Sequence, residues 1–136
     1  MRDDNCIFCK LANGEIPTNT VYEDEDFRVI LDAAPAAKGH ALILPKEHYA
    51  DIYEVEEETL ARAAKLAKRV IAHEKEALGC DGYNMLQNNG EAAGQTIFHF
   101  HMHLIPRYAA EEKLLMWKSQ TFSDEEMKEI CEKMQM

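Results

Sequence analysis

Three histidines alternate with apolar residues in one short segment of the chain. Residues 97–105 read Ile-Phe-His-Phe-His-Met-His-Leu-Ile. Because side chains of a β-strand point alternately to its two faces, His99, His101 and His103 are expected to share one face, with neighbours about 6.6 Å apart. The opposite, core-facing side would carry Phe98, Phe100, Met102 and Leu104. This spacing suits side chains that hold a phosphate group from several sides.

Two kinds of chemistry fit the three histidines. Imidazole is a common metal ligand. It is also a nucleophile near neutral pH, because its ordinary pKa of about 6.5 leaves a free lone pair that can attack phosphorus directly. A purely structural sheet gains nothing from three titratable rings on one face, since their protonation would crowd like charges. The row therefore predicts a functional site.

The loop before the histidines favours phosphate over metal. Residues 88–96 read Asn-Asn-Gly-Glu-Ala-Ala-Gly-Gln-Thr. Its glycines let backbone N–H groups approach an anion closely, and Asn88 and Gln95 add neutral donors. A phosphate site would use such a loop, whereas a metal site would not need it. Taken alone, the loop also fits an ordinary hairpin connection.

Composition narrows the class of partner. The 136 residues carry a formal net charge of −10, which repels nucleic-acid backbones and excludes them as partners. A phosphate site in such a chain has to be built locally from histidines, amides and backbone N–H groups. The chain begins with charged residues, and no apolar run approaches the roughly 18 residues of a membrane span. We therefore expect a cytoplasmic protein with no membrane partner.

The surrounding pattern predicts one α+β domain over residues 1–136. Strands are expected at residues 20–23, 27–32, 40–44, 82–87 and 96–105. Helices are expected at residues 6–13, at residues 56–78, and from Ser123 onward, where Glu126 completes a capping box. Short connections favour antiparallel pairing, with the long helix covering one face of the sheet. Residues 109–136 form a C-terminal tail and helix.

Both long helices have an apolar face. In the helix at residues 56–78, the apolar face comprises Leu60, Ala63, Ala64, Ala67, Val70, Ile71 and Leu78. In the tail helix it comprises Met127, Ile130, Cys131 and Met134. The first face is expected to cover the sheet.

Cys6 and Cys9 form a Cys-x-x-Cys pair that has several interpretations. A cytosolic chain keeps its thiols reduced, so a structural disulfide is not expected. A redox role is disfavoured, because no βαβ pattern precedes the pair. Two further ligands would make a tetrahedral structural zinc site. The remaining alternative is a pair of free thiols on a short helix.

Three segments together resemble the histidine triad (HIT) family. The segment from His99 to Ile105 matches the signature of three alternating histidines followed by two apolar residues. Upstream, Asp32-x-x-Pro35 and Gly39-His40-Ala41-Leu42-Ile43-Leu44-Pro45-Lys46-x-His48 are similar to the central segment of the family. Cys6-Ile7-Phe8-Cys9-Lys10 followed by Glu15-Ile16-Pro17 is similar to its N-terminal segment. The resemblance covers roughly residues 5–107 and implies a HIT-like fold with about five antiparallel strands.

The resemblance also implies a mechanism. His101 matches the family nucleophile, which attacks the α-phosphorus of a purine nucleotide and forms a covalent nucleotidyl-histidine that water then hydrolyses. His103 would hydrogen-bond the phosphate oxygens as charge develops. His99 would help to fix the site, and His40 matches a fourth family histidine. No organic cofactor is implied.

The resemblance further implies how substrate and metal are held. Asn88 and Gln95 match contacts to the phosphate and the leaving group, and Asp32 matches the acidic residue that binds the ribose hydroxyls. The apolar slot for the base would comprise Phe8, Leu11, Ile16 and Ile30. Zinc-bearing members of bacterial type imply a structural Zn²⁺ held by Cys6, Cys9, His48 and His99. Family members are usually homodimers joined through the long helix and an adjacent strand.

The subclass depends on the C-terminal part of the chain. The phosphoramidase branch of histidine triad nucleotide-binding proteins ends soon after the triad, whereas here Trp117 is followed by another helix. Pro106-Arg107 is more similar to the dinucleoside polyphosphate branch. The leading hypothesis is an adenosine 5′-monophosphoramidase-like hydrolase. The alternatives are a dinucleoside polyphosphate hydrolase, a non-catalytic nucleotide-binding module, and a zinc-dependent hydrolase with His99, His101 and His103 as ligands.

Overall fold

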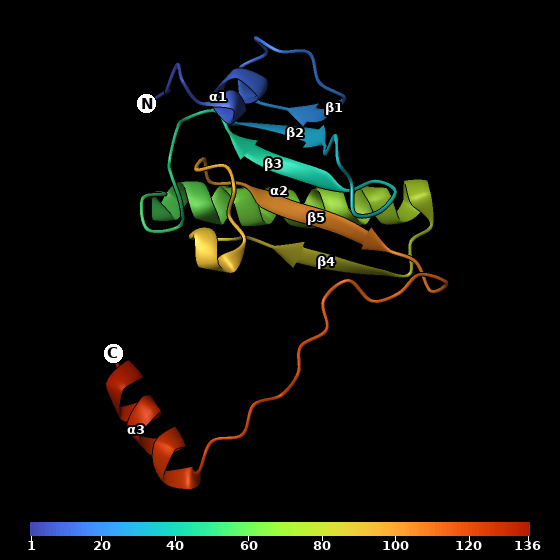
Figure 1. The fold of residues 1–136 in the computed structure, drawn as a ribbon. Helices are drawn as coiled ribbons and strands as arrows, with labels where there is room; N and C mark the ends of the chain where they lie inside the picture. The colour runs from blue at the N-terminus through green and yellow to red at the C-terminus, as the bar shows by residue number, and fades with distance from the viewer.

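The protein is built around one five-stranded antiparallel sheet. The computed structural model describes all 136 residues. In chain order the elements are α1 (Ile7–Ala12), β1 (Thr20–Glu23), β2 (Phe27–Leu31), β3 (Ala41–Pro45), α2 (Glu57–Leu78), β4 (Gly82–Leu86), the 3₁₀ turn η1 (Glu91–Ala93), β5 (Met102–Arg107) and α3 (Asp124–Met134). The strand order across the sheet is β1-β2-β3-β5-β4, and every neighbouring pair is antiparallel (Figure 1). The expected α+β fold is therefore confirmed.

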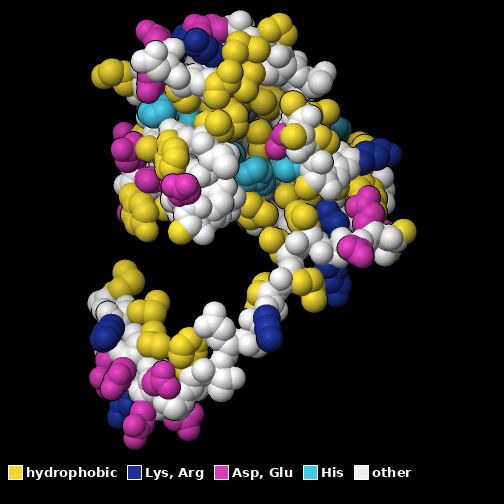
Figure 2. All heavy atoms as spheres, in the orientation of Figure 1, with side chains coloured by type: hydrophobic (Ala, Val, Ile, Leu, Met, Phe, Trp, Pro, Cys, Tyr) yellow, Lys and Arg dark blue, Asp and Glu magenta, His cyan; other side chains and the backbone are white.

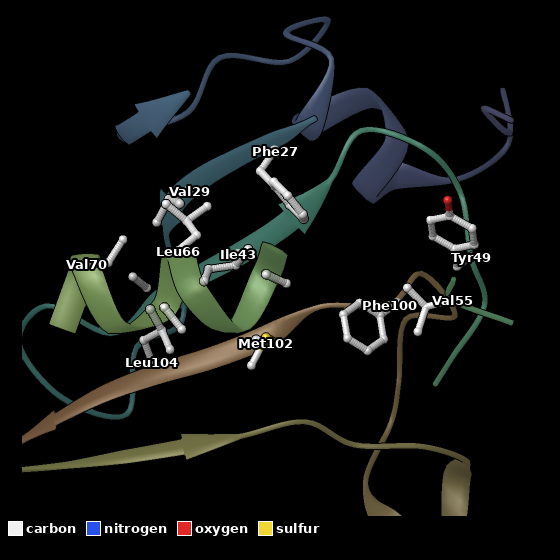
Figure 3. Close-up of a cluster of buried hydrophobic side chains, with 13 residues drawn as sticks. Phe27, Val29, Ile43, Tyr49, Val55, Leu66, Val70, Phe100, Met102 and Leu104 are labelled. Atoms are coloured by element: carbon white, nitrogen blue, oxygen red, sulfur yellow. The ribbon is translucent and has the colours of Figure 1, made fainter. Parts of the chain in front are cut away.

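Helix α2 covers one face of the sheet and forms the main core with it (Figures 1 and 3). The strands contribute Val29, Ile43, Met102 and Leu104 to this core, and α2 contributes Ala63, Leu66, Ala67 and Val70. The helix ends at Gly79, whose φ of 65° is the left-handed conformation that glycine adopts without strain. Of the face expected from sequence, Ala64 is exposed, whereas Leu66, which was not expected, is buried.

The short helix α1 lies on the opposite face of the sheet. A second apolar cluster gathers there, comprising Ala12, Ile30, Leu42 and Leu44 with Phe8 and Leu11 packed against them. Strand β3 is consequently buried on both faces, which explains its unbroken apolar run Ala-Leu-Ile-Leu-Pro. The α1 face of the sheet is also the one that carries the functional histidines.

The histidine segment becomes a regular strand later than its alternation predicts. Strand β5 begins at Met102, so His99 and His101 lie in irregular backbone before it, and the expected strand over residues 96–105 is wrong at its start. The Phe100 N–H donates to the Tyr49 carbonyl at 2.6 Å instead of to a neighbouring strand. Phe98, which was expected in the core, is half exposed. In residues 99–101, contacts with distant parts of the chain thus replace the hydrogen bonds to a neighbouring strand.

The C-terminal tail leaves the sheet. Residues 108–123 contain no helix or strand, and α3 stands apart from the rest of the molecule (Figure 1). Ser123 accepts a hydrogen bond from the Glu126 N–H and the Glu126 carboxylate bonds back to the Ser123 N–H, so the expected capping box is confirmed. None of the helices is both long enough and apolar enough to cross a lipid bilayer.

Candidate active site and metal centre

A cleft of about 460 Å³ opens on the α1 face of the sheet. The cleft brings together seven of the residues singled out from sequence: Phe8, Leu11, Ile30, Asp32, Asn88, His101 and His103. In the space-filling view, histidine side chains reach the surface among hydrophobic ones in the middle of this face (Figure 2). Most of the apolar lining comes from α1, β2 and β3. The polar lining includes Asn88 after β4, Asp32 after β2, and His101 and His103 at the start of β5. The cleft therefore offers apolar surface for a flat apolar group and polar side chains for a charged one.

The backbone fixes which nitrogen of His101 is free. The Nδ1 atom lies 2.7 Å from the carbonyl oxygen of His99, which can only accept a hydrogen bond, so Nδ1 carries the proton and donates it. The Nε2 atom then holds a lone pair. The ring is also held in place by the edge of Phe8, with the two ring centres 4.8 Å apart. His101 thus has the form that a nucleophile requires.

A second backbone group decides, through His40, which ring nitrogen of His103 carries the proton. The Ala36 N–H donates to Nδ1 of His40 at 2.9 Å, so the proton of the His40 ring is on Nε2. That Nε2–H lies 3.0 Å from Nδ1 of His103 and donates to it. The remaining proton of His103 is therefore on Nε2, which is a hydrogen-bond donor. Asp32 lies beside this pair, with a carboxylate oxygen 3.5 Å from Nε2 of His40.

Burial keeps all four rings neutral at physiological pH. It lowers the pKa of His99 to about 4, and together with the nearby His101 and His40 it lowers the pKa of His103 to about 4. Burial also lowers the pKa of His101, and it lowers that of His40 against the opposing effect of Asp32. Neutral rings keep the lone pairs that nucleophilic attack and metal binding both require.

A second cluster lies at the end of the sheet next to α1. Its members are Cys6, Cys9, His48 and His99, whose ligand atoms all lie within 4.8 Å of one another. The Sγ atom of Cys9 is 3.4 Å from Nδ1 of both histidines, and the Sγ atom of Cys6 is 3.5 Å from Nδ1 of His99. All four residues named from sequence therefore meet in one place.

The cluster fits a tetrahedral zinc ion. With Zn–S bonds of about 2.3 Å and Zn–N bonds of about 2.0–2.1 Å, neighbouring sulfur and nitrogen ligands lie about 3.5 Å apart. The His99 Nε2–H donates to the Pro45 carbonyl at 2.8 Å, which leaves the His99 Nδ1 lone pair facing the sulfurs. The His99 ring is fully buried. His99 thus faces this cluster and not the cleft, and the three histidines do not converge on a shared metal position.

Two residues expected in the substrate site do not line the cleft. Gln95 is buried, and its side chain is engaged within the protein: Oε1 accepts from the Gly90 N–H at 2.8 Å and Nε2 donates to the Ala50 carbonyl at 2.8 Å. Ile16 is half-buried beyond the cleft lining. Gln95 therefore shapes the loop that carries Asn88.

Other cleft residues escaped the sequence analysis. Thr18 and Asn19 come from the connection between α1 and β1, and Thr96 follows the loop before the histidines. The sequence analysis ended the N-terminal family segment at Pro17, although the short polar segment that follows lies next to a strand, which is a common place for binding residues. Leu42 was placed on a strand without a role, yet its side chain lines the cleft.

Comparison with known proteins gives one consistent family. Residues 13–110 match the HIT domain family. The sequence is 43% identical over 127 residues to an uncharacterized HIT-like protein of Methanocaldococcus jannaschii, covering 92% of this chain and 98% of that one. It is 42% identical over 129 residues to an adenosine 5′-monophosphoramidase of Schizosaccharomyces pombe, covering 94% of each chain.

Solved structures agree with these sequence matches. A HIT family protein from Bacillus anthracis superposes with a TM-score of 0.87 at 40% identity, covering 96% of this chain and 94% of that chain. A zinc-bound histidine triad family protein from Mycobacterium smegmatis superposes with a TM-score of 0.77 at 36% identity, covering 91% of this chain and 88% of that chain.

Proposed function

Since this chain belongs to the HIT family, we propose that it is a purine nucleoside phosphoramidase that works through a covalent bond between His101 and the α-phosphorus. The observation that carries the proposal is the 2.7 Å hydrogen bond from His101 Nδ1 to the His99 carbonyl. This bond leaves the Nε2 lone pair of a neutral ring at the edge of the cleft. A nearby relative named adenosine 5′-monophosphoramidase supports a nucleotide substrate.

The first step transfers the nucleotidyl group to the protein. Nε2 of His101 attacks the α-phosphorus, a phosphorus–nitrogen bond to His101 forms, and the bond to the leaving amine breaks as the amine takes a proton from solvent. His103 donates its Nε2–H to a phosphate oxygen, where negative charge increases in the transition state. His40 and the Ala36 N–H keep that proton on Nε2.

The second step releases the product. Water attacks the same phosphorus, the bond to His101 breaks, and the Nε2 lone pair is restored. The proton of the attacking water passes to solvent, and a nucleoside monophosphate leaves. Splitting one displacement into two lowers each barrier, because imidazole is both a good nucleophile and a good leaving group near neutral pH.

The cleft walls support binding of a nucleoside. Phe8, Leu11 and Ile30 form an apolar wall that fits a purine ring. Asp32 accepts one hydrogen bond from the Ala34 N–H at 2.9 Å and retains acceptor capacity for the ribose hydroxyls. Asn88 also lines the cleft and would be a neutral donor for the phosphate. Gln95 acts through the loop that presents Asn88.

A structural zinc ion is part of the proposal. Cys6, Cys9, His48 and His99 would hold it, and the zinc-bound relative supports this assignment. The ion would supply a closed tetrahedral centre that joins α1 to the end of the sheet. The chain itself fixes the His99 carbonyl next to His101, and that carbonyl orients the nucleophile.

We also propose a homodimer. Strand β4 lies at the edge of the sheet, where one side of its backbone is available for pairing. In β4, Met85 is half exposed and supplies apolar surface at that edge. A second copy would cover both the edge and the neighbouring end of α2.

Incubation with adenosine 5′-phosphoramidate tests this function. The parent protein is expected to release AMP, and the His101→Gly variant is expected to bind the substrate but not release AMP. His73→Ala is the matched control, because His73 is exposed on α2, and it should keep full activity. Adenosine tetraphosphate and diadenosine polyphosphates in the same panel identify the preferred leaving group.

Three outcomes would oppose the proposal. Binding without turnover by the parent indicates a nucleotide-binding module. Activity that is lost on chelation and restored by zinc, with no nucleotidyl adduct in the intact mass, indicates a zinc-dependent hydrolase. Full activity of His101→Gly excludes His101 as the nucleophile.

A further inference from the structure

The root of the C-terminal tail is fastened to the domain. Ala109 N–H donates to Asp81 Oδ2 at 2.8 Å, and the Tyr108 hydroxyl donates to the Lys38 carbonyl at 2.8 Å. Arg107 donates to the Glu112 carbonyl at 2.6 Å. These bonds come from the end of β5 and direct the following residues away from the sheet. The direction of the tail is therefore set by specific contacts at its base.

Beyond its root the tail exposes an apolar surface. Met127, Ile130, Cys131 and Met134 recur at helical spacing along one side of α3, and all four are exposed. Trp117, on the way to α3, is 84% exposed. Figure 2 shows hydrophobic side chains of this region open to solvent. Apolar side chains gathered in this way are typical of a surface that another protein covers.

The tail helix needs a packing partner to be stable. It has 11 residues and no buried side chain. Isolated helices shorter than about 12–15 residues are marginal in water, because nucleation is costly and few hydrogen bonds repay it. A capping box contributes only about 1 kcal/mol. The domain of the same chain contributes no hydrogen bond to α3, so the missing stabilisation has to come from another molecule.

The same outstretched placement recurs in a relative. Residues 1–107 make up less than four fifths of the chain, so a perfect superposition of the domain alone could not reach the TM-score of 0.87 found over 96% of the chain. The tail must therefore contribute to the superposition with the Bacillus anthracis protein. Two chains that are 40% identical share this placement, although beyond its root the tail makes no hydrogen bond to its own domain.

We propose that the tail of each protomer packs on a second copy of this chain, so that the two protomers of the homodimer exchange their C-terminal arms. A second copy is the one partner that is present wherever the chain is present. Exchange of a terminal segment is a common way to extend a symmetric dimer, because both copies gain the same contact. The inference rests on the proposed homodimer and adds the C-terminal arm to the edge strand β4 as a segment that joins the two protomers.

Cross-linking of isotope-labelled protein tests the exchange. Unlabelled and ¹⁵N-labelled full-length chains are mixed, unfolded and refolded together, and treated with reagents that couple lysines and carboxylates. Links from α3, through Lys128, Lys133 or Glu129, to residues 1–107 are then sorted by isotope. Arm exchange predicts that about half of these links join a labelled to an unlabelled chain, as random pairing requires. Links confined to one isotope would show that the tail folds on its own domain.

Matched variants separate the apolar face from the helix itself. The double variant Met127→Ser with Ile130→Ser is expected to lose the mixed links and to shift sedimentation towards the monomer. The control, Glu129→Ser with Glu132→Ser on the opposite side of α3, should keep both. Equal behaviour of the two variants, or no links from α3 at all, would overturn the arm exchange. AMP release is measured separately, so an inactive protein that still gives mixed links rejects the proposed function only.

Discussion

At the scale of single residues, the site depends on three backbone groups that decide where protons lie. The His99 carbonyl accepts a hydrogen bond from His101 Nδ1–H, and the Pro45 carbonyl accepts one from His99 Nε2–H. The Ala36 N–H donates to His40 Nδ1. Similar neutral imidazoles thereby acquire the protonation that the proposed nucleophile, the proposed metal ligand and the donor to His103 each require. Backbone groups are well suited to this task, because they cannot change their protonation state.

Replacing His40 tests the donor chain. His40→Phe keeps an aromatic ring in a buried position but removes the donor to His103 Nδ1, which lets the His103 proton move away from Nε2. Hydrogen bonds that involve charge are worth about 1.5–3 kcal/mol, so kcat should fall roughly 10- to 150-fold while KM changes little. His40→Gln, which retains an amide donor, should recover part of the loss.

Nitrogen-15 NMR of the imidazole rings measures the tautomer of His103, which would not change if the role of His40 were only structural. It should show the His103 proton on Nε2 in the parent and a mixture of tautomers in His40→Phe. An unchanged kcat together with an unchanged His103 tautomer would contradict the donor chain.

At the scale of secondary-structure elements, each layer of the fold positions part of the site. The pairing of Leu42 with His103 places His103 beside β3, and α1 brings Phe8 and the two cysteines over the same end. On the other face, α2 buries Glu74 under the sheet, where the Tyr83 hydroxyl of β4 donates to it. The last contact joins α2 to the edge strand.

Removal of zinc tests the contribution of α1. Purified protein should contain one zinc per chain, and chelation should lower the midpoint of thermal unfolding. At a free zinc concentration 100 times its Kd, the ion would stabilise the fold by about 2.7 kcal/mol. Cys9→Ser should lose the metal, whereas Cys131→Ser, on the exposed α3, should retain it. A protein that binds no zinc, or whose stability is insensitive to chelation, would contradict the proposed centre.

The buried Glu74 predicts a pH-dependent stability. Burial raises the pKa of this carboxyl, against the opposing effects of the Tyr83 hydroxyl and His73. The folded state therefore holds the proton more tightly than the unfolded state, so this contribution is fully present below the unfolded pKa of about 4.3 and is lost as pH rises through the folded pKa.

Glu74→Gln should consequently increase the free energy of unfolding at pH 8 relative to the parent, since the amide oxygen still accepts from Tyr83. The difference should shrink towards pH 4, and urea unfolding across this range measures it. Glu76→Gln, on the exposed side of α2, is the control. A parent that is more stable than Glu74→Gln at pH 8 would contradict the account.

Sequence periodicity predicted the elements better than their ends. The five strands and the helices follow from local alternation and helical spacing, and Ser123 with Glu126 located the start of α3. The start of β5 could not be predicted in this way. His99 lies outside the strand and instead bonds to the Pro45 carbonyl and contacts Cys9. Both partners are far from His99 in the sequence, so local alternation does not reveal them. The buried Glu74 also escaped prediction, because its partner Tyr83 lies on another element.

Some of the site residues could likewise be predicted from the local sequence pattern, and others could not. The alternation in the sequence singled out His101 and His103, although only His103 lies within a strand of the structure. The cluster of Cys6, Cys9, His48 and His99 was assembled through the family resemblance, because its members are up to 93 residues apart. Neither the alternation nor the family resemblance predicted that the side chain of Gln95 bonds within its own loop.

At the scale of the whole molecule, the compact domain that holds the histidine cleft carries a detached arm, and the chain has a large negative charge. The formal charge of −10 opposes the approach of any anionic substrate, so the cleft must overcome a repulsion that extends over a Debye length. The arm adds acidic residues at α3. Substrate affinity is therefore set by local contacts against an unfavourable field.

This field predicts an unusual response to salt. KM for an adenosine phosphoramidate should fall as ionic strength rises from about 0.01 M to 0.15 M, because the Debye length shortens from about 30 Å to about 8 Å and screens the repulsion. Initial rates at several salt concentrations measure the trend, with kcat as the internal control. A KM that rises with salt would mean that net attraction brings the substrate to the cleft.

The proposed mechanism requires that an imidazole nitrogen bonds to phosphorus during turnover. Its most direct test is the stereochemical course of hydrolysis at an α-phosphorus made chiral with sulfur and oxygen isotopes. Attack by His101 followed by attack by water inverts the configuration twice, so the account predicts net retention in the nucleoside monophosphorothioate product. Net inversion would mean that water attacks phosphorus in a single step and would contradict the account.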